Sequence, residues 1–114
     1  MWILPLVVLL GGLVLGVVGY LGLVGRLPRN DFAGVRTATT MRSDATFLAA
    51  NRAAGPPTLA GGGVGLVGAV VAWLMPGEIG VVTASLVALA VMTGLTVLGA
   101  VKGVRAAKAV VEPR

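Results

Sequence analysis

Three long segments without a charged residue divide the chain. They run from Trp2 to Gly25, from Leu59 to Met75 and from Ile79 to Val101. Because an α-helix rises about 1.5 Å per residue, the first and third segments are long enough to cross the hydrocarbon core of a bilayer, and the second is near the lower limit. The pattern predicts an all-α membrane protein with a single membrane domain, residues 1–114, and transmembrane helices at residues 2–25, 59–75 and 79–101.

The segment between the first two spans, residues 26–57, is longer than a simple connector and carries its own helix signals. Ser43 or Asp44 suits the N-cap of a helix, and Gly55 suits the position just after the last helical residue. We therefore expect a short amphipathic interfacial helix over about residues 44–54, lying on the membrane surface.

Prolines flank the second span. Pro56 and Pro57 precede it, at positions where a missing N–H has little cost. Pro76 and Gly77 follow it and leave only a short turn before the third span. Such a short connection predicts that the second and third helices are antiparallel neighbours.

The positive charges give an orientation. All nine Lys and Arg residues lie in the loop, residues 26–57, or in a basic tail, residues 102–114. With three spans, the loop and the tail fall on the same side, and basic residues favour the cytoplasmic side. We expect a multi-pass membrane protein with the N-terminus outside, the C-terminus inside, and anionic lipid headgroups as the partners of the basic residues.

Composition narrows the function classes. The chain is 57% hydrophobic and 11% charged, and it contains neither Cys nor His. We therefore expect no enzyme, no catalytic residue, no cofactor and no metal site, because the commonest nucleophile, base and ligands are missing. All four acidic residues lie outside the spans, so the intramembrane carboxylate typical of proton-coupled transporters is missing too. The net charge of +5 comes without an aromatic stacking platform or a helix-turn-helix pattern, so we expect no nucleic-acid binding.

Small residues recur at intervals of four within the spans. The pairs are Gly12 with Gly16, Gly61 with Gly65, Gly68 with Ala72, Ala84 with Ala88, and Ala90 with Gly94. This spacing places small side chains on one helix face and lets two backbones approach closely. We favour packing within the three-helix bundle. Assembly into a homo-oligomer, or docking on a larger membrane or cytoplasmic protein partner, is the alternative.

The loop carries a motif made of Pro28, Asn30, Gly34, Arg36, Thr37, Thr40, Asn51, Arg52 and Gly55. This motif resembles the signature of the SdpI family of bacterial membrane proteins. The family pattern is a Pro-x-Asn turn, a Gly-Ile/Val-Arg-Thr stretch with a Pro-Trp-Thr-like continuation, and a Trp ahead of a His-Arg or Asn-Arg pair. Ala38 and Thr39 replace the usual Pro and Trp, Phe47 replaces the later Trp, and Asn51 replaces the more frequent His.

The resemblance implies a protein embedded in the bacterial cytoplasmic (inner) membrane. Such a protein would give immunity to a membrane-active toxin or signal envelope stress through its cytoplasmic loop. In that family, the proteins protect the envelope and hold a repressor at the membrane. For Arg36, two interpretations stay open: pairing with Asp31 or Asp44 to fold the loop, or binding of a lipid phosphate. Two other functions also fit the sequence, namely an accessory subunit of a larger membrane complex and a holin-like protein that permeabilises membranes.

Overall fold

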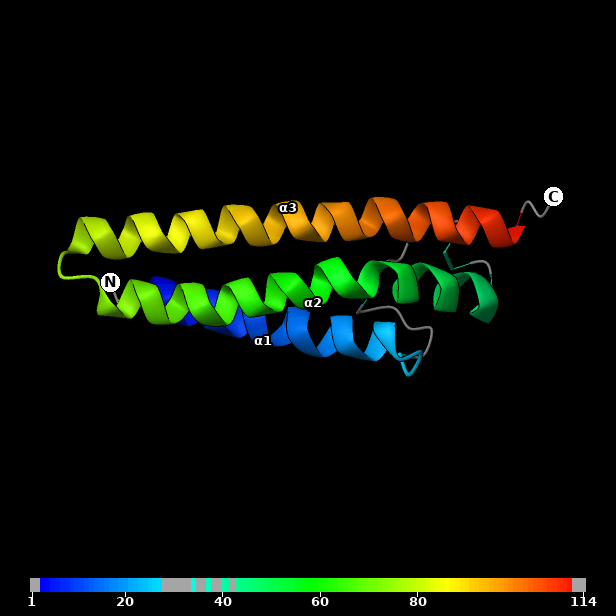
Figure 1. The fold of residues 1–114 in the computed structure, drawn as a ribbon, viewed down its shortest axis with the longest axis horizontal. Coiled ribbons are helices and arrows are strands. Elements are labelled where there is room, and N and C mark those ends of the chain that lie inside the picture. Colours follow the sequence, from blue (N-terminus) through cyan, green and yellow to red (C-terminus); the bar gives the residue numbers. More distant parts are fainter. Residues whose placement is uncertain (1–2, 28–33, 35–36, 38–39, 42, 112–114) are drawn as a thin grey trace.

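The computed structural model shows three long helices that lie side by side in an elongated bundle (Figure 1). It describes residues 3–27, 34, 37, 40–41 and 43–111. The helices are α1 (Ile3–Leu23), α2 (Asp44–Leu74) and α3 (Glu78–Val111), and the bundle measures 55 × 21 × 19 Å. Each helix is long and apolar enough to cross a membrane, which confirms the predicted three-span membrane protein.

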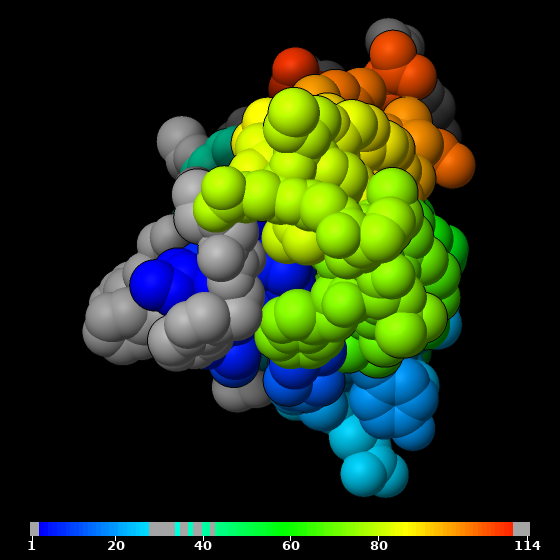
Figure 2. Space-filling model, turned by 90° about the vertical axis from the view of Figure 1, so that its left-hand side faces the viewer, coloured from blue at the N-terminus to red at the C-terminus, as the bar shows by residue number. Residues whose placement is uncertain are grey.

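Helix α2 is the centre of the bundle. It packs along both α1 and α3, whereas α1 and α3 touch each other little. A view along the bundle shows α3 (yellow) above and α1 (blue) below, with α2 (green) at their side (Figure 2). We call the end with Ile3 and the α2–α3 turn the turn end, and the end with Leu23, Asp44 and Val111 the loop end (Figure 1).

Helix α2 begins where the sequence predicts. Ser43 is the N-cap, and its Oγ accepts a hydrogen bond of 3.1 Å from the Thr46 backbone N–H. In return, the Thr46 Oγ1 accepts one of 3.0 Å from the Ser43 backbone N–H. This reciprocal capping box satisfies backbone donors that a helix start otherwise leaves without partners.

The predicted end of that helix at Gly55 is wrong. Helix α2 continues through Gly55, Pro56 and Pro57 into the second span, so residues 44–54 are the first turns of a transmembrane helix rather than a separate interfacial helix. Gly55 is there because α1 is close: an added Cβ would lie 2.8 Å from the Cα of Leu23. Each proline removes one N–H donor and crowds the carbonyl four residues earlier, and packing against both neighbouring helices holds α2 together despite this cost.

Helix α3 also runs further than predicted. It ends at Val111 rather than Val101, so most of the expected tail at residues 102–114 is helical. Gly103 and Ala107 are buried in this extension, and the start of α2 lies beside the end of α3 (Figure 1). The loop end is therefore a pair of packed helices that extends past the end of α1.

Helices α1 and α2 meet through glycines. A Cβ added to Gly62 would lie 2.6 Å from both the Cα and the N of Gly16, and one added to Gly65 would lie 2.5 Å from the Cα of Gly12. Real Cβ atoms do not approach so closely, so the two backbones are in contact. This confirms that Gly12 and Gly65 pack within the bundle.

At this contact an added methyl group would collide with the partner helix from Gly62 but not from Gly16. The two glycines therefore provide a test variant and a matched control. Gly62→Ala should lower the melting temperature in detergent, because overpacking typically costs about 1–3 kcal/mol. Gly16→Ala adds the same methyl group to the partner helix, but its Cβ would meet nothing within 4 Å. We expect this control to melt at or slightly above the wild-type temperature. An equal drop in melting temperature in the two variants would contradict this arrangement of the two backbones.

Candidate functional site

Helix α1 ends in a turn that directs the chain into the loop. Gly25 has a φ of +75°, in the left-handed region that glycine adopts readily. The Arg26 N–H donates a hydrogen bond of 2.8 Å to the Leu21 carbonyl, and the Gly25 N–H donates one of 3.2 Å to the Gly22 carbonyl. This pair of bonds is a Schellman motif, which ends the helix at the level where the motif loop begins.

The two halves of the predicted motif meet at Gly34 and Asn51. Gly34 has a φ of +94°, and a Cβ added to it would collide with the Oδ1 of Asn51 and lie 2.9 Å from the Cδ2 of Leu27. The Asn51 side chain is 5% exposed, and its Nδ2 donates a hydrogen bond of 3.0 Å to the Phe47 carbonyl. The loop is thus packed on α2 at a point where only a glycine fits.

Thr37 and Thr40 shape the turn that leads into α2. The Thr37 N–H donates a hydrogen bond of 2.7 Å to the Oγ1 of Thr40, and the Thr40 N–H donates one of 3.2 Å to the Oγ1 of Thr37. Thr40 is fully buried, and its carbonyl accepts a hydrogen bond of 2.9 Å from the Oγ1 of Thr46 in the capping box. These threonines hold the loop in place against the start of α2.

Arg52 and Gly55 bring the second half of the motif against α1. The guanidinium of Arg52 lies beside Gly25, where an added Cβ would be 2.8 Å from its Nη2, and Gly55 packs against Leu23. The structure therefore brings six predicted residues together at the loop end. Pro28, Asn30 and Arg36, the other three, lie outside the described residues.

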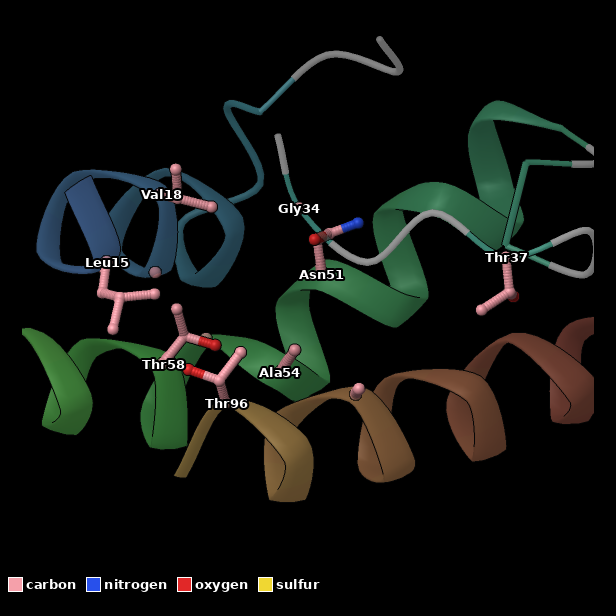
Figure 3. Close-up of a pocket in the computed structure, with 11 residues that line it drawn as sticks. Leu15, Val18, Gly34, Thr37, Asn51, Ala54, Thr58 and Thr96 are labelled. Atoms are coloured by element: carbon pink, nitrogen blue, oxygen red, sulfur yellow. The ribbon is translucent and has the colours of Figure 1, made fainter. Parts of the chain in front are cut away.

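A cleft of about 270 Å³ lies under the loop, between the three helices (Figure 3). Four motif residues line it: Gly34, Thr37, Asn51 and Gly55. The other lining residues come from all three helices, and they are Leu15, Val18, Gly19, Ala54, Thr58, Thr96 and Ala100. The motif thus forms one side of a cavity that the loop sequence alone does not reveal.

Motif reasoning missed the two threonines deeper in the cleft, Thr58 and Thr96. A signal for Thr58 exists in the sequence, because Asn51, Gly55 and Thr58 follow the i, i+4, i+7 spacing of a single helix face. The Thr96 Oγ1 donates a hydrogen bond of 2.8 Å to the Met92 carbonyl of its own helix.

Among the described residues that line the cleft, the polar side chains are neutral. They are the hydroxyls of Thr37, Thr58 and Thr96 and the amide of Asn51, and the rest of the lining is aliphatic side chain or glycine backbone. Such groups donate and accept hydrogen bonds without carrying charge, so the arrangement suits recognition of an apolar molecule with a neutral polar group.

The chain matches a known protein family. A model of the SdpI/YfhL protein family matches residues 26–101, about two thirds of the chain. The matched stretch contains the whole motif, all of α2 and all the cleft residues except those on α1. Searches of curated proteins and of solved structures find no match.

The contact between Gly34 and Asn51 can be tested through the order of the loop. Gly34→Ala should expose the loop, because the methyl group both collides with Asn51 and disfavours a positive φ. The measurement is the rate of tryptic cleavage in detergent, which should rise several-fold. Gly77→Ala is the control, because a Cβ there would meet nothing within 4 Å. An unchanged rate in Gly34→Ala would show that the loop does not depend on this contact.

Proposed function

Because the chain belongs to the SdpI/YfhL family, we propose that it protects a bacterial cell membrane against a membrane-active toxin, and that the motif loop is the part that acts. A related alternative is that the same loop signals envelope stress. One observation carries the proposal. The loop is packed on the helices through Gly34 and Asn51 and lines a cleft, so it has the defined surface that recognition requires.

The proposal includes an orientation with the loop end in the cytoplasm. Exposed basic residues gather at that end, on all three helices or just beyond them, where they meet anionic headgroups. They are Arg26, Arg52, Lys102, Arg105 and Lys108. The described part of the turn end carries Glu78 and no basic residue.

Reporter fusions test this orientation. A reporter that is active only in the cytoplasm should work when it is fused after Arg114 and fail when it is inserted between Pro76 and Glu78. A reporter that is active only outside the cytoplasm should give the opposite pattern. The reverse of both results would overturn the N-out, C-in orientation and place the motif loop outside the cell.

The role of the loop is tested by two arginine variants. Arg36→Lys should reduce protection of cells, because a guanidinium grips a phosphate or carboxylate at two points and an ammonium does not. Arg105→Lys, at an exposed position on α3, should change protection little, because charge near the leaflet is retained there. The assay is survival under a membrane-active peptide toxin, with the amount of membrane-inserted protein measured in parallel.

The outcomes separate the proposal from its rivals. Equal effects of the two substitutions would make the loop a cluster of charges that only sets topology. Loss of the protein from the membrane in Arg36→Lys would make this arginine structural. Abrupt lysis on expression of the wild type would favour a holin-like function, and recovery with a large partner in mild detergent would favour an accessory subunit.

A further inference from the structure

The cleft exists because α1 and α3 separate toward the loop end. Near the turn end they are joined through Val8 and Met92, and a Cβ added to Gly11 would lie 3.3 Å from the Cε of Met92. Nearer the loop end, α3 packs on α2 instead: a Cβ added to Gly99 would lie 3.0 Å from the Oγ1 of Thr58. The space between α1 and α3 is left open there, and exposed Thr96 lies at its edge.

An opening between two transmembrane helices faces the bilayer. Among the described residues the lining is mostly aliphatic, from side chains such as Leu15, Val18 and Ala100, and none of these lining residues is charged. Such a surface holds water poorly and disfavours a charged ligand. The molecule that reaches it from the side is a lipid, and the part that suits an aliphatic cleft is an acyl chain.

The Thr58 hydroxyl gives the cleft a specific polar group. Thr58 is 9% exposed, lines the cleft, and makes no hydrogen bond to any residue that the structure describes. In Figure 3 the oxygens of Thr58 and Thr96 point toward each other. The Thr96 hydroxyl already donates its hydrogen bond to the Met92 carbonyl. Buried hydroxyls normally have a partner, so Thr58 has a proton to donate to an acceptor in the cleft.

The depth of Thr58 indicates which acceptor is available. The first charged residues toward the loop end are Arg52 on α2 and Lys102 on α3, six residues from Thr58 and Thr96 respectively, or about 9 Å along each helix. Arg and Lys side chains extend toward the headgroups, while the Thr58 side chain leans toward the N-terminus of α2, which is the same direction. Thr58 therefore lies below the phosphate layer, and the deepest hydrogen-bond acceptors that a glycerolipid carries, nearest to Thr58, are its ester carbonyls.

We propose that the cleft binds one acyl chain of a phospholipid from the leaflet at the loop end, with the Thr58 hydroxyl donating a hydrogen bond to the ester carbonyl of that chain. Arg52 and Lys102 supply the positive charge for the phosphate above it. The inference goes beyond protection against a toxin, because it assigns a lipid site that needs no toxin and does not depend on Arg36.

Ester and ether lipids test the hydrogen bond. The full-length protein is reconstituted in nanodiscs of phosphatidylglycerol with either ester-linked or ether-linked chains of equal length, and lipid retained after gentle release is counted by native mass spectrometry. Wild type should retain ester lipid about five-fold more than ether lipid, the factor that one hydrogen bond typically contributes. The Thr58→Val variant should retain ester lipid and ether lipid equally, each in the amount in which wild type retains ether lipid. Thr93→Val is the control, because the exposed Thr93 bonds the Leu89 carbonyl away from the cleft, and it should behave as wild type.

Filling the cleft tests the acyl chain. Ala100→Phe should remove the retained lipid, whereas Ala90→Phe, at an exposed position on the same helix, should not. Melting temperature reports whether each variant is folded, and if Ala100→Phe unfolds, Thr58→Val decides the matter alone. Equal retention of ester and ether lipid by wild type, full retention in a folded Ala100→Phe, or a second protein copy in place of the lipid would each overturn the proposal.

Discussion

The close backbone contact between α1 and α2 determines the rest of the structure. Lipid tails are as apolar as leucine, so two helices in a bilayer gain little from hiding side chains and associate through close packing. Here glycines on both helices permit that packing, from Gly12 against Gly65 to Gly22 against the Asn51 backbone. The contact fixes the end of α1 beside α2 at the level of the motif. Both ends of the loop are thereby held in place, at the end of α1 and at the start of α2.

The sequence predicts the spans well because their signals are strong and local. A long uncharged segment predicts a membrane span, Ser43 predicts a helix start, and the short turn after Met75 predicts two antiparallel helices. The structure agrees with all three predictions. The continuity of α2 has no such local signal. Gly55 followed by two prolines is typical of a helix end, yet neighbours on both sides hold α2 together there. Packing partners decide this point, and they are distant in the sequence.

The candidate site also contains residues that the sequence predicts and residues that only the structure reveals. The motif identified Gly34, Thr37, Asn51 and Gly55, and the structure places all four around one cleft. Thr58 could be inferred only from its place on the same helix face as Asn51 and Gly55, and Thr96 could not be inferred at all, because it lines the cleft from a different helix, α3. Several motif residues also have a clear structural role, since the two threonines form a turn and two glycines allow close contacts. A motif of this kind specifies the shape of a surface as well as its chemistry.

The three helices differ in length, and the difference matters for a protein in a bilayer. Helix α1 has 21 residues, about 32 Å, close to the thickness of the hydrocarbon core. Helices α2 and α3 have 31 and 34 residues, so only they continue past the core at the loop end. The shortest helix therefore sets the position of the bundle in the membrane. A thicker bilayer would draw the end of α1 and the loop attached to it toward the lipid tails, so mismatch between protein and membrane would act first on the segment that carries the motif.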